Sequence, residues 1–331
     1  MMMKTPNFWY QKRGLFSYAL WPLGVLYGAA TALRVKKLEG ILRAKCPVIC
    51  VGNINAGGTG KTPTTIALVE RLQARGHSIV VISRGYKGSE AGPVLVNPML
   101  HTAEQVGDEP LLISAFCEVV VARDRRAALK LAQEQIPDAI LMDDGFQSPL
   151  IQKDLSIVVV NAALGFGNGF CIPAGPLREP VDGGLKRSDI FLSIGSEDSQ
   201  KTFRSQLTNS FDEMHVTGEV KPLRTGMCWE GLDVFAFAGI AHPLNFFTTL
   251  KLLGANIRGY EALSDHEPLS LALMKRLAAK AAKMNAQMVC TEKDAARLPM
   301  EYRKQVLALP VRLEISDWSK IDIFLDELGL F

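Results

Sequence analysis

The sequence predicts an α/β fold: a parallel sheet with helices on both faces, a second, smaller α/β domain, and a membrane-associated helix at the N-terminus. Three observations lead to this prediction. Short apolar runs alternate with helical stretches, a glycine-rich loop follows the first run, and a long uncharged stretch lies near the N-terminus. The 331 residues suffice for about two domains. With 48% apolar and 21% charged residues, the composition excludes a disordered or fibrous chain.

Residues 1–45 form a basic and aromatic segment. It holds eight Lys or Arg residues against one acid, and seven aromatic side chains occur by Tyr27. No charge occurs from residue 14 to residue 33, a stretch that would be about 30 Å long as a helix. Small residues and Pro22 dilute the stretch, and basic residues flank both ends. We therefore expect a helix that lies in the surface of an anionic membrane.

Two other interpretations of this segment stay open. One is a signal peptide cleaved after Ala30-Thr31-Ala32, where small residues have the spacing of a cleavage site. The other is a helical hairpin buried against the body of the protein, because short apolar helices are often core elements.

The rest of the chain is slightly acidic. Of the 37 basic and 34 acidic residues, 29 and 33 lie outside residues 1–45. A body with this charge is a poor nucleic-acid binder, so we expect no nucleic-acid partner. The six cysteines show neither the spacing of a zinc site nor a disulfide framework.

Continuous apolar runs, typical of strands buried on both faces, mark two successive α/β units. The first unit has runs at residues 47–51, 78–83, 118–122, 139–143, 156–161 and 190–194, with helical stretches at 63–75, 109–116 and 125–135. The second has runs at 234–238, 256–260, 287–290 and 311–315, with helical stretches at 243–253, 268–284 and from about 317. The predicted organisation is therefore an N-terminal segment 1–45, a first domain 46–210, a connection 211–230 and a second domain 231–331.

The loop after the first apolar run has the pattern of a phosphate-binding loop. A strand, a glycine-rich loop, Gly60-Lys61-Thr62 and a helix follow one another in the order of a P-loop NTPase-like domain. We expect ATP to bind to this loop, which comprises Asn55, Ala56, Gly57, Gly58, Thr59, Gly60, Lys61 and Thr62. Backbone N–H groups would surround the phosphates, Lys61 would reach the β and γ phosphates, and Thr62 would offer its hydroxyl to Mg²⁺. Asn55 stands where the motif has its first glycine.

A pair of carboxylates follows another strand of the same sheet. The apolar run 139–142 leads directly into Asp143-Asp144, a pattern typical of the acids that hold Mg²⁺ beside a P-loop. We expect Thr62, Asp143 and Asp144 to form the metal site. The guanine-binding pattern Asn-Lys-x-Asp does not occur in the sequence, which favours ATP over GTP.

Seven short motifs together resemble one family along nearly the whole chain. They are 51–63, Ser83-Arg84-Gly85-Tyr86, Gly107-Asp108-Glu109-Pro110, 143–147, Gly175-Pro176-Leu177-Arg178-Glu179-Pro180, Asp265-His266 and 291–295. In this order they resemble the tetraacyldisaccharide 4′-kinases of lipid A biosynthesis. The resemblance implies an enzyme that transfers the γ-phosphate of ATP to the 4′-hydroxyl of a membrane-embedded tetraacyldisaccharide 1-phosphate. It also implies a peripheral or monotopic protein at the cytoplasmic face of the bacterial inner membrane.

The same resemblance implies roles for individual residues. Asp108 and His266 match the carboxylate and imidazole that prepare the sugar hydroxyl for attack, chemistry suited to a general base. Arg84, Gln147, Arg178 and Glu179 are expected to contact phosphates or substrate. Glu267 stands where the family often has a second histidine. Thr291-Glu292-Lys293-Asp294 fits a helix capping box, so we interpret that motif as structural.

Two alternatives to a lipid kinase follow from the P-loop alone. One is a switch or chaperone ATPase that hydrolyses nucleotide to change shape. The other is a soluble kinase of a small molecule, with the N-terminal segment as part of its core.

Overall fold

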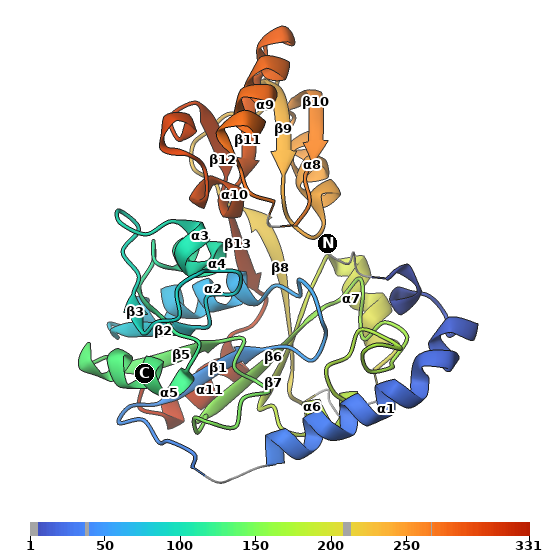
Figure 1. Ribbon diagram of the computed structural model, residues 1–331, viewed down its shortest axis with the longest axis vertical. Helices are drawn as coiled ribbons and strands as arrows, with labels where there is room; N and C mark the ends of the chain where they lie inside the picture. Colours follow the sequence, from blue (N-terminus) through green and yellow to red (C-terminus); the bar gives the residue numbers. More distant parts are fainter. Residues whose placement is uncertain (1–5, 37–39, 208–212, 266) are drawn as a thin grey trace.

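The computed structural model describes residues 6–36, 40–207, 213–265 and 267–331, which form two α/β domains stacked end to end (Figure 1). The larger domain contains the P-loop, and the smaller one lies above it in Figure 1. The strands β8 (His215–Pro222) and β13 (Val311–Ile315) run side by side from the larger domain toward the smaller one. The α/β fold predicted from the sequence is confirmed.

The sheet of the P-loop domain has the strand order β13-β8-β7-β6-β1-β5-β2-β4-β3 within the described chain. Its remaining strands are β1 (Val48–Gly52), β2 (Ile79–Ser83), β3 (Val94–Leu95), β4 (Glu118–Val121), β5 (Ala139–Asp143), β6 (Leu155–Asn161) and β7 (Ile190–Ile194). All neighbours pair in parallel except β3 with β4 and β13 with β8. The central strands β1, β2, β5 and β7 are buried at every residue, which explains their continuous apolar runs.

Helices cover both faces of this sheet. One face packs against α2 (Lys61–Ala74), α4 (Asp108–Ile113) and α11 (Ser319–Glu327). The other packs against α5 (Arg125–Glu134), α6 (Val181–Leu185) and α7 (Glu197–Arg204). The short helix α3 (Ala103–Val106) precedes α4. Alternate residues of β1 serve the two cores, since Ile49 and Val51 face one and Val48 and Cys50 the other.

The second domain is a smaller sheet of the same type. Its strand order in the described residues is β10-β9-β11-β12, and all pairs are parallel. The strands are β9 (Asp233–Ala238), β10 (Asn256–Ala262), β11 (Gln287–Thr291) and β12 (Val306–Leu309). The helices are α8 (Pro243–Leu252), α9 (Leu271–Lys283), α10 (Glu292–Ala296) and the 3-10 turn η3 (Met300–Tyr302). Helices α8 and α9 pack on opposite faces of β9.

The predicted domain boundaries are wrong at the connection and at the C-terminus. Residues 211–230 were expected to connect the domains, but β8 is a strand of the large sheet. Residues 311–331 were expected in the second domain, but β13 pairs with β8, and Ile321 and Leu325 of α11 are buried in the P-loop domain's core. The second domain is thus inserted between two adjacent strands, an arrangement that spacing along the chain does not reveal.

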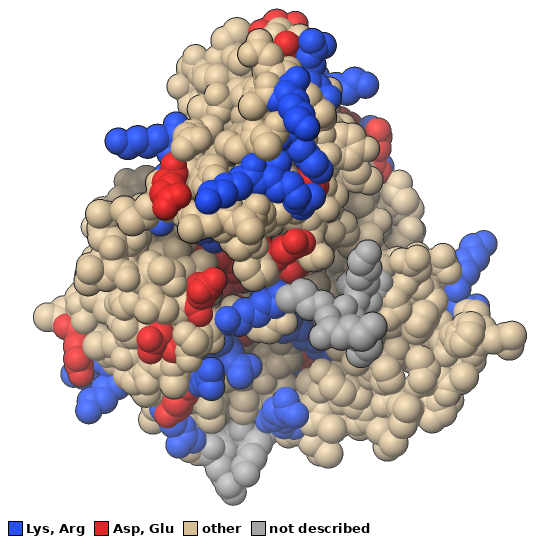
Figure 2. Space-filling model, turned by 45° about the horizontal axis from the view of Figure 1, so that its top comes forward, with Lys and Arg blue, Asp and Glu red and all other residues tan. Residues whose placement is uncertain are grey.

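The helix α1 (Leu15–Lys36) presents small residues to the body and large apolar residues to the outside. Its buried residues are Ser17, Gly24, Gly28 and Thr31. At Gly24 a Cβ atom would lie 2.7 Å from the Cys171 carbonyl oxygen, so the close approach requires glycine. Its exposed side chains include Leu15, Phe16, Tyr18, Trp21, Leu23, Val25, Leu26, Tyr27 and Leu33. The face of the molecule around α1, at the lower right of Figure 2, carries few charged side chains.

Hydrogen bonds fix the segment before α1 to the same part of the body. The indole of Trp9, in the 3-10 turn η1 (Asn7–Tyr10), donates to the Pro173 carbonyl oxygen at 2.9 Å. The Arg13 guanidinium donates to the Asn168 carbonyl oxygen at 2.9 Å, and the Asn168 amide donates to Ser17 at 3.2 Å. Helix α1 and the segment before it are therefore docked on residues 168–174 of the P-loop domain.

Replacing Leu325 by Ala is expected to destabilise the P-loop domain by about 2 to 5 kcal/mol, because it removes a fully buried side chain. Calorimetry with and without MgATP identifies the melting transition of that domain as the one that the nucleotide raises. Leu325→Ala should lower that transition, whereas Ile323→Ala, on the same helix but 58% exposed, should leave it nearly unchanged. A loss confined to the other transition would contradict the assignment of α11 to the P-loop domain.

Candidate active site

The loop between β1 and α2 has a fixed backbone. The Asn53 amide donates to the Thr59 hydroxyl at 2.9 Å and to the Gly57 carbonyl oxygen at 3.4 Å, which ties the two ends of the loop together. Gly60, the residue that caps the N-terminus of α2, has a φ of 100°, a left-handed conformation that favours glycine. The N-terminus of α2 therefore opens into this loop, where its amide groups and dipole favour a phosphate.

Strand register places the acidic pair next to this loop. Val51 of β1 pairs with Asp143 of β5 in parallel, so the loop and the two carboxylates leave the sheet at the same edge. Asp143 is 3% exposed, and its Oδ2 atom lies 3.4 Å from the Ser83 hydroxyl. Its Oδ1 atom is buried and has no hydrogen-bond partner among the residues that the structure describes. Burial and the nearby Glu109 charge raise the pKa of Asp143 to about 7.

Asp144 lies in the opposite electrostatic environment. Its Oδ1 atom is 2.9 Å from Arg178 Nη1 and 3.7 Å from Lys61 Nζ. Burial alone would raise the pKa of Asp144, but Lys61 and Arg178 outweigh it and hold the pKa below its ordinary value. Arg125 donates to the Asp144 carbonyl oxygen at 2.6 Å, and the residue adopts a φ of 51°. A left-handed backbone thus directs the two adjacent carboxylates differently.

The loop that contains Arg178 and Glu179 packs against the P-loop. The Arg178 amide donates to the Ile54 carbonyl oxygen at 2.7 Å, and Ala56 donates to the Pro176 carbonyl oxygen at 2.7 Å. The Gln147 amide bridges the two loops, donating to the Asn53 carbonyl oxygen at 2.7 Å and to Glu179 at 3.0 Å. Glu179 is buried and also pairs with Arg187.

Asn55, the departure from the motif, has a structural task. Its amide donates to the Gly165 carbonyl oxygen at 2.9 Å, which anchors the first part of the P-loop to the segment before residues 168–174.

The structure brings together the predicted loop residues 55–62, both acids and three of the four additional predicted contacts. The fourth, Arg84, is exposed directly after Ser83 at the end of β2.

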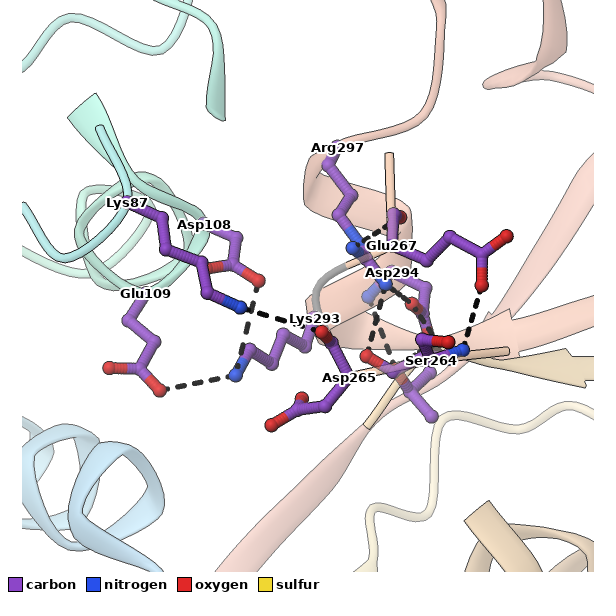
Figure 3. A network of polar contacts seen from close by, with 11 residues as sticks. Lys87, Asp108, Glu109, Ser264, Asp265, Glu267, Lys293, Asp294 and Arg297 are labelled. Atoms are coloured by element: carbon purple, nitrogen blue, oxygen red, sulfur yellow. Dashed lines mark hydrogen bonds and ion pairs between the residues drawn. The ribbon is translucent and has the colours of Figure 1, made fainter. Parts of the chain in front are cut away.

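Asp108 begins α4, which packs on α2 and faces the second domain. Its side chain is 6% exposed, and its Oδ2 atom lies 3.9 Å from Lys293 Nζ of α10 (Figure 3). Charged side chains gather around the hollow between the two domains in Figure 2. The predicted partner of Asp108, His266, lies outside the described residues.

Sequence reasoning overlooked two charged residues near this site. Glu109 follows Asp108, and its charge reaches Asp143, whereas Lys293 comes from the second domain and contacts both acids of α4. Glu109 stands in the Gly-Asp-Glu-Pro motif and Lys293 in the Thr-Glu-Lys-Asp motif. The helix start predicted for the latter motif is present, because the Thr291 side chain accepts from the Asp294 amide as an N-cap.

Comparison with known proteins identifies the family. The family model described as Tetraacyldisaccharide-1-P 4'-kinase matches residues 16–329. A tetraacyldisaccharide 4'-kinase of Jannaschia sp. is 51% identical over 326 residues, which cover 98% of this chain and 99% of that protein. One of Dinoroseobacter shibae is 52% identical over 330 residues, with 98% of each chain covered.

A solved structure has the same fold. The crystal structure of LpxK from Aquifex aeolicus in complex with ATP matches with a TM-score of 0.78 at 24% identity, covering 95% of this chain and 99% of that one. These matches give no support to the alternative of a switch or chaperone ATPase. The resemblance predicted from the short motifs is confirmed, and the chain belongs to the tetraacyldisaccharide-1-phosphate 4′-kinase family.

Proposed function

We propose that this chain performs the reaction of its family with the P-loop and the Asp143–Asp144 pair holding MgATP, and with Asp108 as the base. The family activity is an ATP-dependent phosphotransfer to the 4′-hydroxyl of a tetraacyldisaccharide 1-phosphate in lipid A biosynthesis. The assignment of Asp108 as the base depends on one observation, the position of α4 beside the nucleotide site. This helix packs on α2, and its Glu109 is close enough to affect the ionisation of Asp143, so Asp108 lies at the same end of the nucleotide site.

The residues around the loop fit a nucleotide and a divalent cation. Asp143 carries a buried oxygen without a protein partner, and carboxylates together with phosphate oxygens and water are the ligands that Mg²⁺ prefers. We assign Thr62, Asp143 and Asp144 to the metal, which when bound neutralises charge on the phosphates. Lys61 and Arg178 share Asp144, and both are placed to turn toward phosphate oxygens.

The proposed step is an in-line displacement. Asp108, which we propose acts together with His266, accepts the proton of the 4′-hydroxyl as the hydroxyl oxygen forms a bond to the γ-phosphorus. The bond between that phosphorus and the β,γ-bridging oxygen breaks, and ADP leaves with the electron pair. Lys61 and Arg178 stabilise the charge that develops on the phosphate oxygens. Gln147 and Glu179 fix the P-loop backbone beside the nucleotide. We propose that Arg84, exposed directly after β2, contacts a phosphate or the substrate.

The acceptor determines where the enzyme works. Its family acts at the bacterial inner membrane on a lipid disaccharide. We propose that α1 lies in the cytoplasmic face of that membrane, because its large apolar side chains point away from the body and basic residues flank it. The slightly acidic body supports the absence of a nucleic-acid partner.

Asp108→Asn is expected to reduce phosphate transfer by about 10² to 10⁴ without loss of ATP binding, because only the base is removed. Lys61→Ala should also abolish transfer, but with weaker ATP binding. Transfer of labelled phosphate from ATP to the tetraacyldisaccharide measures the first effect and calorimetric titration the second. Lys201→Ala, which removes an exposed pair with Glu197, is the control. Transfer near the wild-type rate by Asp108→Asn would refute its assignment as the base.

Asp143→Asn is expected to stabilise the nucleotide-free and metal-free protein by about 2 to 4 kcal/mol at pH 8. The pKa of Asp143 is raised to about 7 in the folded protein, first by burial, whereas the unfolded chain has an ordinary carboxyl. Between these values the unfolded chain releases a proton that the folded protein retains, so wild-type stability falls as the pH rises. Asp143→Asn cannot ionise at this position, so the variant does not lose stability in this way as the pH rises. Urea unfolding from pH 4 to pH 8 measures the difference, and a difference that does not grow with pH contradicts the prediction.

Membrane binding is expected to depend on the outward face of α1. Leu23→Glu with Leu26→Glu places two charges among side chains that are 54% and 67% exposed, so flotation with phosphatidylglycerol vesicles should be lost. Leu252→Glu, at an 83% exposed leucine of the second domain, should float like the wild type. Raising the salt concentration should weaken flotation of the wild type, because the basic flanks bind anionic lipid. Equal flotation of the double variant would exclude α1 as the contact.

A further inference from the structure

Lys293 reaches from the second domain into the P-loop domain. Its Nζ atom lies 3.1 Å from Glu109 Oε1 and 3.9 Å from Asp108 Oδ2, and Figure 3 shows the side chain extending from α10 toward these two acids. The lysine side chain is 20% exposed and that of Asp108 is 6% exposed. Ion pairs this well shielded from water are stronger than surface pairs. The contact therefore connects the proposed base to the other domain.

The residues next to Lys293 hold its backbone in place. Asp294 is fully buried, accepts from the Gly239 amide at 3.1 Å and pairs with Arg297. Glu292 pairs with Arg312 of β13 at 2.9 Å. These contacts attach the start of α10 to the ends of β9 and β13. Lys293 thus extends from a rigid turn of helix, and it is the member of the Thr-Glu-Lys-Asp motif that contacts α4.

The charges around Asp108 come from several elements. The described ones that act on this cluster are Glu109 on α4 itself, Lys87 after β2, Asp265 after β10, Lys293 on α10 and Arg297 directly after α10. Lys87 Nζ also lies 3.5 Å from the Asp265 carbonyl oxygen. Lys87 of the P-loop domain thus contacts the second domain, as Lys293 of the second domain contacts the P-loop domain. Burial alone would lower the pKa of Lys293, but Glu109, Asp108 and Asp265 outweigh it and raise the pKa. Lys293 is therefore a cation throughout the working pH range.

We infer that Lys293 is a positioning residue of the transfer reaction, which holds the Asp108 carboxylate ionised and oriented when the second domain docks on the P-loop domain. This inference rests on the proposed function, in which Asp108 is the base. A fixed ammonium group stabilises the ionised carboxylate, and a base must be ionised to accept a proton. Lys293 keeps its own proton during the step. The motif Thr291-Glu292-Lys293-Asp294, which begins a helix, thus also contributes a residue to the reaction.

The test compares two substitutions of Lys293 in the transfer assay. Lys293→Met keeps the length and apolar stem but removes the charge, so kcat should fall by about 10- to 100-fold. The acidic limb of the pH profile of kcat/KM should move to higher pH, because Asp108 then binds its proton more tightly. Lys293→Arg restores a cation, so the acidic limb should return to its wild-type position.

A matched control separates charge at the site from charge elsewhere. Lys280→Met removes a pair with Glu261 at 2.7 Å inside the second domain and should leave kcat and the pH profile unchanged. Calorimetry on each variant shows whether both domains are folded. If Lys293→Met does not fold, Lys293→Gln replaces it as the neutral variant.

The possible outcomes distinguish this inference from the proposed function. A Lys293→Met enzyme with wild-type kcat overturns the inference, and so does a reduced kcat with an unmoved acidic limb, which would indicate a structural contact only. Asp108→Asn is measured in the same assay. If that variant is active, the proposed base is wrong. If it is inactive while Lys293→Met is normal, the inference alone fails.

Discussion

The register of β1 against β5 is the constraint on which the site depends. Because Val51 pairs with Asp143, the phosphate-binding loop and the acidic pair leave the sheet at one level. Both strands are buried on both faces. If one of them slipped by one residue against the other, its side chains would point to the opposite core. The same packing that stabilises the sheet therefore fixes the distance between the groups that we propose hold nucleotide and metal.

Burial and charge give the two adjacent aspartates different properties. Asp143 is enclosed by the sheet and meets the Glu109 charge, which raises its pKa, whereas Asp144 turns outward to Lys61 and Arg178, which lower its pKa. The left-handed backbone of Asp144 makes this divergence possible. Asp143 thus has an environment that disfavours its charge, whereas Asp144 shares one negative charge between two cations, Lys61 and Arg178. Adjacent carboxylates of unequal environment suit a site in which one oxygen faces a divalent cation and the other holds the phosphate-binding cations in place, as we propose above.

The sequence allowed prediction of those features that depend on short stretches of chain. The P-loop, the acidic pair and the buried strands each occupy a few consecutive residues whose types and order follow from local chemistry. Features that join distant segments were not predictable in this way. The return of β13 to β8 and the docking of α11 involve residues 215–222 and 311–331, which no local pattern connects. The contact of Lys293 with Asp108 joins residues of different domains, and the capping box gave its motif a sufficient local explanation.

The interface between the domains differs in kind from the cores within them. The cores are apolar, whereas the contacts of α10 with α4 include partly buried ion pairs, and the chain passes between the domains after β8 and before β13. Interfaces between the domains of one chain resemble transient protein–protein interfaces, so relative motion of the domains is the default expectation. A kinase of a lipid needs such an interface, since a bulky acceptor must enter from the membrane and water must be excluded before transfer. With the proposed base, Asp108, on one domain and Lys293 on the other, the proposed reactive arrangement is complete only when the domains meet.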